Sequence, residues 1–119
     1  MARSAPARSE RLQAGDMLSI TQAAKAAGVT AATIKAWIKV GRAIALPMSR
    51  NAHSLPAWQF APAIWDALPL LSSALNWTGP WRLLSFLETP LGGLAGLTPR
   101  QSLEQGDLQR VLALAAEEA

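Results

Sequence analysis

Lys35 and Lys39 are the residues with the clearest chemical purpose in this chain. They lie four residues apart, so a helix over this segment places both ammonium groups on the same face. Two such cations one turn apart suit phosphate oxygens, and contacts of this kind give an affinity for nucleic acid that falls with rising salt. The competing interpretation is a solvated helix face whose lysines only maintain solubility. We favour contact with duplex DNA, because a basic N-terminal segment and a predicted β-hairpin accompany this helix.

The predicted DNA contacts are of two kinds, positioning on phosphates and readout of base edges. Thr33 and Lys35 are the candidates for base-edge contacts. Ala31, Ala32 and Ala36 offer at most an apolar contact to a thymine methyl group. We therefore expect modest specificity from one protomer, raised by dimerisation on a repeated half-site. The predicted phosphate-contact residues are Lys25, Thr30, Lys39, Arg42 and Arg50.

Patterns for catalysis, metal binding or cofactor binding do not emerge from the sequence. The chain has no Cys and one His, which excludes disulfides, thiolate chemistry and His-rich metal sites. His53 has no acidic neighbour to form a dyad, so we interpret it as a surface residue of the hairpin. Ser72, Ser73 and Ser85 lack the glycine setting of a nucleophile elbow, and the glycine-rich loop at 91–96 lacks the lysine of a phosphate cradle. We therefore expect no catalytic residue, no metal, no cofactor and no enzyme activity.

Charge divides the 119 residues into a basic and an acidic half. Residues 1–60 hold eight basic and two acidic side chains, whereas residues 61–119 hold three basic and six acidic ones. This split predicts different partners for the two halves, one of them a polyanion. No apolar run approaches the roughly 20 residues that span a bilayer, so we expect no membrane partner and a cytoplasmic location. Glu10 and Asp16 disfavour a cleaved targeting segment at the N-terminus.

The elements that must position the lysines form a small helix-turn-helix. Thr21 is the predicted N-cap of a helix at 22–27. Gly28 supplies the turn, because glycine takes a positive φ without steric penalty. Thr30 caps a second helix at 31–39, and a glycine at position 41 ends it. This second helix is the one that carries both lysines.

Two extended segments, 43–48 and 53–60, follow the second helix and predict a β-hairpin wing. Trp58 and Phe60 lie two residues apart, so in a strand they point to the same face. An aromatic platform for bases is one interpretation of this pair, but we favour side chains that fill the core. The predicted domains are a flexible basic arm at 1–16, a winged helix-turn-helix at 17–60 and a helical interaction domain at 61–119.

Several short segments of the first half carry a family resemblance. They are Ala23–Ala24, Gly28–Val29–Thr30, Thr33–Ile34, Trp37–Ile38 and Gly41–Arg42. Over about residues 18–60 they resemble the compact winged helix-turn-helix of the MerR/excisionase type. Ala31 and Ala32 depart from that pattern, since such proteins often carry Arg or Gln at these positions. Strong sequence readout is therefore not expected.

The second half is typical of a series of short amphipathic helices. Pro69 either kinks the first of them or starts a new one, and Pro80 suits the first position of the next. The glycine-rich loop at 91–97 is interpreted as a tight connection that lets helices pack closely. Thr98 and Pro99 then form an N-cap and a first helical position. The predicted helices cover residues 63–75, 81–88, 99–105 and 108–117.

An ordered set of residues in this half carries a second resemblance. The set is Trp81, Phe86, Leu87, Thr89, Pro90, Leu94, Gly96, Thr98, Pro99, Leu103, Gly106, Asp107 and Val111. Over about residues 62–119 it resembles the toxin-binding domain of the Xre/MbcA/ParS antitoxins. The resemblance implies a partner, a RES-type toxin that consumes NAD and is neutralised when the C-terminal helices cover its active-site cleft. An acidic half would be steered towards a basic cleft.

The residues expected to contact this toxin are Thr98, Pro99, Arg100, Gly106, Asp107 and Arg110, with Glu117 and Glu118 at the tail. The alternative is that Thr98 and Asp107 serve only as helix caps and the carboxylates only as solvated charge.

The sequence therefore predicts a mainly α protein, with a small winged helix-turn-helix and a short β-hairpin before a helical toxin-binding and dimerisation domain. We interpret it as a bacterial type II antitoxin, a homodimer that represses its own promoter and is nucleoid-associated when bound to DNA. One alternative is a stand-alone transcriptional or excisionase-type regulator whose C-terminal half only dimerises. Another is an accessory subunit of an enzyme that does not bind DNA.

Overall fold

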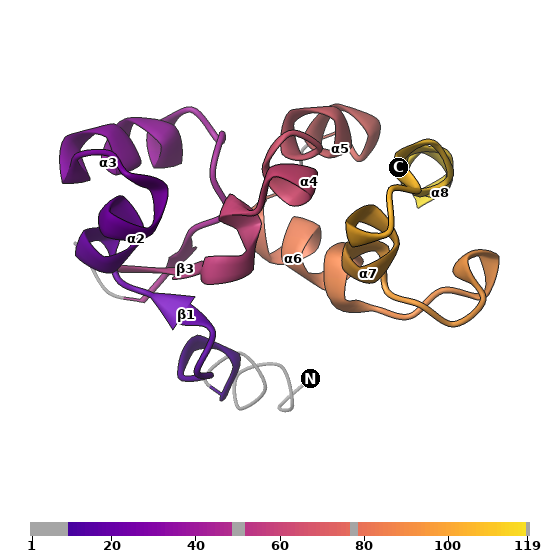
Figure 1. The fold of residues 1–119 in the computed structure, drawn as a ribbon, viewed down its shortest axis with the longest axis horizontal. Helices are drawn as coiled ribbons and strands as arrows, with labels where there is room; N and C mark the ends of the chain where they lie inside the picture. The colour runs from indigo at the N-terminus through magenta and orange to yellow at the C-terminus, as the bar shows by residue number, and fades with distance from the viewer. Residues whose placement is uncertain (1–9, 49–51, 77–78, 119) are drawn as a thin grey trace. The chain divides into compact units, whose positions relative to one another are not determined.

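The computed structural model describes residues 10–48, 52–76 and 79–118. The described residues are mainly helical, with a small three-stranded antiparallel sheet (Figure 1), which confirms the predicted mainly α class. The chain divides into two compact units, Met1–Trp58 and Gln59–Ala119. The division falls two residues before the boundary expected between residues 60 and 61. None of the described helices has the length and apolar character needed to cross a membrane.

The first unit is built on helix α2 (Ile20–Ala27), which begins earlier than its sequence pattern predicted. Ser19, and not Thr21, is the N-cap: the Ser19 hydroxyl oxygen accepts the Gln22 N–H at 3.1 Å. The Gln22 side-chain oxygen in turn accepts the Ser19 N–H at 2.9 Å. This reciprocal capping box satisfies two backbone donors, whereas a cap at Thr21 would satisfy one. Gly28 ends the helix with φ +72°, as predicted.

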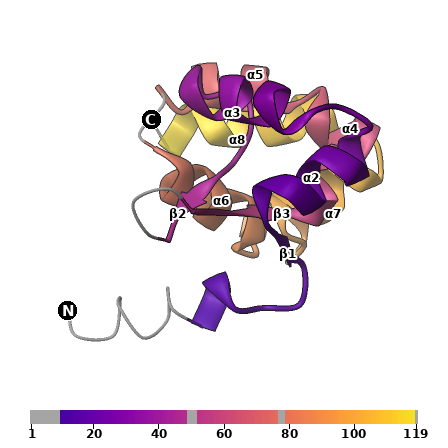
Figure 2. The same cartoon turned by 90° about the vertical axis from the view of Figure 1, so that its left-hand side faces the viewer.

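Helix α3 (Ala31–Lys39) follows after a short turn and packs against α2. The Thr30 hydroxyl oxygen accepts the Thr33 N–H at 3.2 Å, which confirms the predicted N-cap. At the other end Gly41 takes φ +75°, and the Arg42 N–H donates to the Trp37 carbonyl at 2.8 Å. Within α3 Ile34 is fully buried, whereas Trp37 and Ile38 are half-buried. Figure 2 shows this pair of helices above the strands.

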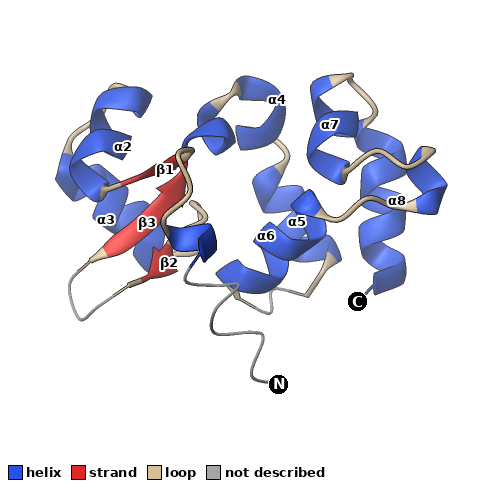
Figure 3. Ribbon diagram, turned by 90° about the horizontal axis from the view of Figure 1, so that it is seen from below, coloured by secondary structure: helices blue, strands red, loops and turns tan. Residues whose placement is uncertain are grey.

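The sheet of the first unit has the strand order β1-β3-β2 and lies beside the two helices (Figure 3). Strand β3 (His53–Pro56) pairs antiparallel with β2 (Leu46–Pro47), with Leu46 opposite Ser54. It also pairs antiparallel with β1 (Met17–Leu18), a third strand in addition to the two predicted ones. The predicted turn between β2 and β3 falls largely on residues 49–51, which lie outside the described residues.

The predicted second strand at 53–60 is wrong in its last four residues. Ala57–Phe60 forms a 3-10 turn, η1. A strand needs a partner to satisfy its backbone groups, and β1 is only two residues long. Trp58 and Phe60 therefore do not share a strand face, although Trp58 is buried as expected of a core anchor.

The described part of the second unit is helical (Figure 1). Of the two alternatives for the helical segment at 63–75, the structure shows the second: Pro69 starts a new helix, because it occupies the first turn, where its missing N–H costs nothing. Pro80 likewise starts its helix, as predicted. Helix α5 packs on α8, and α7 contacts α4, α6 and α8. The helices are α4 (Pro62–Trp65), α5 (Leu68–Ala74), α6 (Pro80–Glu88), α7 (Pro99–Glu104) and α8 (Leu108–Glu118).

The glycine-rich loop between α6 and α7 is a tight, closed connection, as predicted. The Leu91 N–H donates to the Leu97 carbonyl at 3.1 Å, so the two ends of the loop meet. A 3-10 turn, η2 (Gly92–Leu94), lies between them, with Leu94 buried. A Cβ atom on Gly93 would lie 3.0 Å from a Leu114 methyl carbon. Glycine at this position therefore permits the close approach of the loop to α8.

One residue of this loop is strained, and its replacement provides a test of the loop conformation. Ala95 has φ +56°, a left-handed conformation that costs an L-residue with a Cβ roughly 1 kcal/mol. We expect Ala95→Gly to raise the free energy of unfolding by about 0.5 kcal/mol, after the added entropy of glycine in the unfolded chain is subtracted. Urea unfolding followed by circular dichroism measures the change. The matched control, Ala113→Gly on an exposed position of α8, should lower stability by about 1 kcal/mol. A loss of stability in both variants would contradict the loop conformation.

Candidate nucleic-acid interface

Three lysines of the first unit are presented to solvent by its two helices. Lys25 is exposed on α2, and Lys35 and Lys39 are exposed on α3. Their helical spacing directs Lys35 and Lys39 away from Ile34, whose burial fixes the inward face of α3. None of the three lysines has a hydrogen bond or ion pair with another residue in the part of the chain that the structure describes. They are therefore available to anionic groups from outside the chain.

The acidic residues of the first unit lie away from these helices in sequence. The unit has eight basic and only two acidic side chains, Glu10 and Asp16, and both acidic residues precede β1. Asp16 is already paired with Arg11 at 2.7 Å. Within the described ranges, α2 and α3 thus carry cations and no carboxylate. Positive charge that is not compensated in this way raises the local electrostatic potential.

The two threonines predicted to contact DNA sit at the start of α3. Thr30 is exposed and Thr33 is half-buried. Their hydroxyl oxygens lie 3.0 Å apart and are hydrogen-bonded to each other. Both hydroxyls therefore take part in capping the helix, and each has less hydrogen-bonding capacity left for an external ligand.

The two predicted arginine contacts differ from the lysines. Arg42 follows the glycine that ends α3 and is half-buried, so its guanidinium is less accessible than the lysine ammonium groups. Arg50 lies outside the described residues. His53, expected on the surface of the hairpin, is half-buried on β3. The cationic surface that the structure describes is thus made by Lys25, Lys35 and Lys39.

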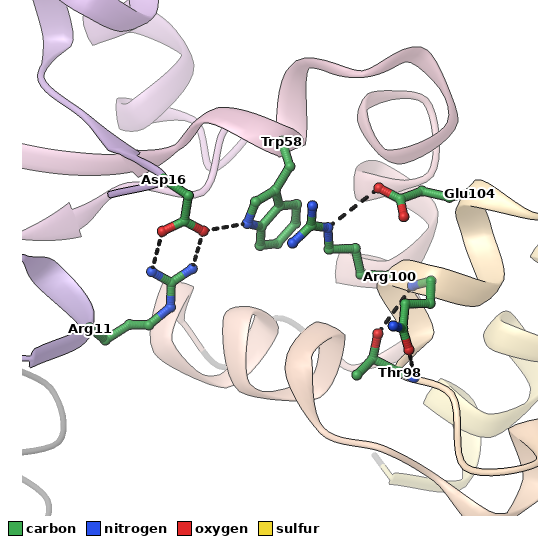
Figure 4. Close-up of polar contacts among 7 residues, drawn as sticks. Arg11, Asp16, Trp58, Thr98, Arg100 and Glu104 are labelled. Carbon is green, nitrogen blue, oxygen red and sulfur yellow. Dashed lines mark hydrogen bonds and ion pairs between the residues drawn. The ribbon is translucent and has the colours of Figure 1, made fainter. Parts of the chain in front are cut away.

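A partly buried polar contact anchors the N-terminal segment of the unit (Figure 4). The Arg11 guanidinium donates to both Asp16 carboxylate oxygens, at 2.7 and 2.8 Å. The Trp58 indole N–H donates to the same carboxylate at 2.9 Å. The Asp16 backbone carbonyl also accepts the Ala57 N–H at 2.8 Å. The flexible arm predicted for 1–16 therefore does not extend over residues 10–16, which are held against β3 and η1.

The hydrogen bond between Trp58 and Asp16 was missed in the sequence because these two residues are 42 positions apart. The one available signal was Trp58, since an indole N–H that is buried needs an acceptor. The hydrogen bond from Arg11 and its positive charge hold the pKa of Asp16 below its ordinary value, against the opposing effect of burial.

The lowered pKa of Asp16 predicts acid-dependent stability of the first unit. A carboxylate with a lowered folded-state pKa stabilises the fold above its unfolded pKa of about 3.9, and that stabilisation is lost as the pH falls through the folded pKa. The stability difference between the native chain and Asp16→Asn should therefore be constant above about pH 5 and shrink below about pH 4. Urea unfolding across this range measures it. Glu10→Gln removes an exposed carboxylate of the same segment as the control. A difference that grows in acid would contradict this role of Asp16.

The residues predicted to contact a protein partner fall into two groups, at the two ends of α7. At its start Thr98 forms a capping box with Gln101, Pro99 is buried, and Arg100 lies 3.4 Å from Glu104. At its end Gly106 takes φ +88°, and Asp107 lies 3.7 Å from Arg110. Thr98 is thus the N-cap of α7, as the alternative interpretation predicted (Figure 4). Pro99 packs inside the unit and offers no accessible contact surface.

An open pocket of about 340 Å³ lies beside the start of α7. It is lined by Leu87, Glu88, Thr98, Arg100, Gln101 and Glu104. The pocket brings two of the predicted partner-contact residues, Thr98 and Arg100, together with two carboxylates from α6 and α7.

Each of the three arginines of the second unit has an acidic partner within the unit. Arg100 pairs with Glu104 and Arg110 with Asp107. Arg82 lies 3.6 Å from Glu118 and also donates to the Glu118 backbone carbonyl at 2.9 Å. Because the unit has six acidic and three basic side chains, it keeps an excess of negative charge after these pairs have formed.

No group of three or more His, Cys, Asp or Glu residues within the described ranges is placed to hold a metal ion. Comparison of the chain with models of known families, with curated proteins and with solved structures found no match.

Proposed function

We propose that this protein is an antitoxin that binds promoter DNA through its first unit and neutralises a RES-type toxin through its second. The observation that carries the DNA-binding part is the set of three exposed lysines, Lys25, Lys35 and Lys39, without a described partner on two adjacent helices. In this proposal α2, α3 and the β2–β3 pair act as a winged helix-turn-helix. Helix α3 enters the major groove with Lys35 near the base edges, and Lys25 and Lys39 neutralise phosphates on the walls of the groove.

The toxin-binding part of the proposal is supported by the residue order that resembles the Xre/MbcA/ParS antitoxins. The charge of the second unit agrees with it, since its arginines are paired internally and its excess charge is negative. A toxin with a basic cleft for NAD would be attracted to this unit. A homodimer on a repeated half-site completes the proposal, because the first unit offers few groups for reading bases.

DNA binding is tested by the anisotropy of a labelled fragment of the protein's own promoter, titrated with the full chain. We expect binding whose logarithmic affinity falls linearly with the logarithm of salt between about 50 and 200 mM. Lys39→Ala should reduce the slope of that line by about one, because one phosphate contact is removed. Absence of binding at the lowest salt would contradict the proposed DNA contact.

Toxin neutralisation is tested by coexpression with the product of the adjacent gene. We expect the full chain to copurify with that product and to relieve its growth arrest. The variant Lys25→Ala/Lys35→Ala/Lys39→Ala should still relieve the arrest, because the lysines lie in the other unit. If the neighbouring gene encodes no toxin, the stand-alone regulator with a C-terminal dimerisation domain is favoured instead.

A further inference from the structure

We propose that base recognition by this protein depends on one side chain, Lys35, and that its target is a guanine. The inference rests on the proposed insertion of α3 into the major groove. It narrows the two base-edge candidates of the sequence, Thr33 and Lys35, to one.

The exposed surface of α3 near its N-terminus offers very few hydrogen-bonding groups. Recognition helices contact base edges with the residues of their N-terminal half. Between Ala31 and Ala36 of α3 the exposed positions are Ala32, Lys35 and Ala36, whereas Ile34 is fully buried. Alanine provides only a methyl group, which can touch a thymine methyl but cannot distinguish donors from acceptors. Lys35 is therefore the one exposed hydrogen-bonding side chain between Ala31 and Ala36, since the exposed N-cap, Thr30, already uses its hydroxyl to accept the Thr33 N–H.

The structure makes Thr33 a weaker candidate for a base-edge contact than the sequence suggested. It is half-buried, and its hydroxyl is hydrogen-bonded to the Thr30 hydroxyl at 3.0 Å. The Thr33 N–H also donates to Thr30 at 3.2 Å. Thr33 is thus part of the cap that starts α3, and a base contact would compete with that cap.

Lys39 lies one turn further along α3 and has a different expected role. Four residues of helix place it about 6 Å nearer the C-terminus than Lys35. A straight helix in the groove diverges from the bases towards its C-terminal end, where side chains meet phosphates. Lys39 is therefore assigned to the backbone and Lys35 to a base.

The chemistry of an ammonium group selects guanine. Lysine has three donors and no acceptor. Guanine presents two neighbouring acceptors, O6 and N7, in the major groove, whereas adenine places a donor, N6, beside its N7. One protomer should therefore discriminate strongly at one G·C pair, with thymine methyl contacts to Ala32 or Ala36 beside it.

The test measures competition between the promoter fragment and duplexes in which each base pair is replaced in turn. For the native full chain we expect one position in each half-site where replacing G·C weakens binding roughly tenfold or more. Lys35→Ala should bind the duplexes with equal affinity whichever base pair occupies that position. Lys35→Arg should restore the preference for G·C, since arginine also donates to O6 and N7. Lys39→Ala should weaken every duplex by a similar factor and keep the preference.

Two results would overturn the assignment while leaving the proposed function intact. One is a guanine preference that persists in Lys35→Ala. The other is a preference that Thr33→Val removes although circular dichroism shows α3 still folded. Absence of binding by the native chain to any duplex would instead overturn the DNA-binding proposal itself, and the assignment with it.

Discussion

The variant Lys25→Ala/Lys35→Ala/Lys39→Ala is expected to bind duplex DNA roughly 100- to 1,000-fold more weakly than the native chain at about 0.1 M salt. Lys25 and Lys39 each release a counterion when they neutralise a phosphate, so losing both should also lower the magnitude of the salt slope by nearly two, whereas the loss of Lys35 removes a base contact. Anisotropy titrations at several salt concentrations measure both quantities. All three side chains are exposed, so the variant should fold as the native chain does.

The second unit provides a control with the same change in net charge. Arg82→Ala/Arg100→Ala/Arg110→Ala removes three positive charges whose ion pairs are exposed and contribute little to stability. DNA affinity of this variant should change far less than that of the triple-lysine variant. Equal losses in both variants would show that net charge governs binding, and would contradict a specific surface on α2 and α3.

Ile34→Ala is expected to destabilise the first unit by about 2–5 kcal/mol. Ile34 is fully buried, at 0% exposure, where α3 packs against α2. Truncation leaves a cavity in addition to the lost burial of apolar surface. Because a unit of this size has a small margin of stability, the variant should also lose DNA affinity at 37 °C as α3 unfolds. Urea unfolding followed by circular dichroism gives the free energy.

Further substitutions at Ile34 and Ile38 separate the effect of burial on stability from the effect of helix propensity. Ile34→Val should cost about 0.5–1.5 kcal/mol, because it removes one methylene group. Ile38→Ala makes the same chemical change one turn away at a half-buried position and should cost less than Ile34→Ala. If Ile38→Ala proved the more destabilising, the inward face of α3 would be misplaced.

Turns and helix ends were the features most accurately predicted from the sequence. Gly28 and Gly41 end α2 and α3, and Thr30, Pro80 and Thr98 start helices where expected. These outcomes depend on the φ angles and hydrogen bonds of neighbouring residues, so a short sequence window contains the required information. The N-cap of α2 was misplaced because both Ser19 and Thr21 can cap, and only Ser19 has a glutamine three residues later to complete the box.

Strand length and burial were not predictable in the same way. The strand expected over 53–60 ends at Pro56, because only two residues of β1 are available to pair with β3. Exposure of Lys35 and Lys39 followed from helical periodicity, yet the burial of Pro99 and the reduced access to Arg42 did not. Both depend on which segments pack against them.

Local chemistry in the chain therefore determined where most helices begin and end, which face of α3 carries its lysines, and how positive and negative charge divide between the two halves. Tertiary structure alone decided that the Trp58 indole N–H donates to Asp16, that β1 becomes a third strand, and that Pro99 is buried. The physical reason is the sequence separation of the interacting residues: a cap or turn is determined by residues no more than about four or five positions apart. An indole N–H finds its carboxylate 42 residues away only after the chain has folded.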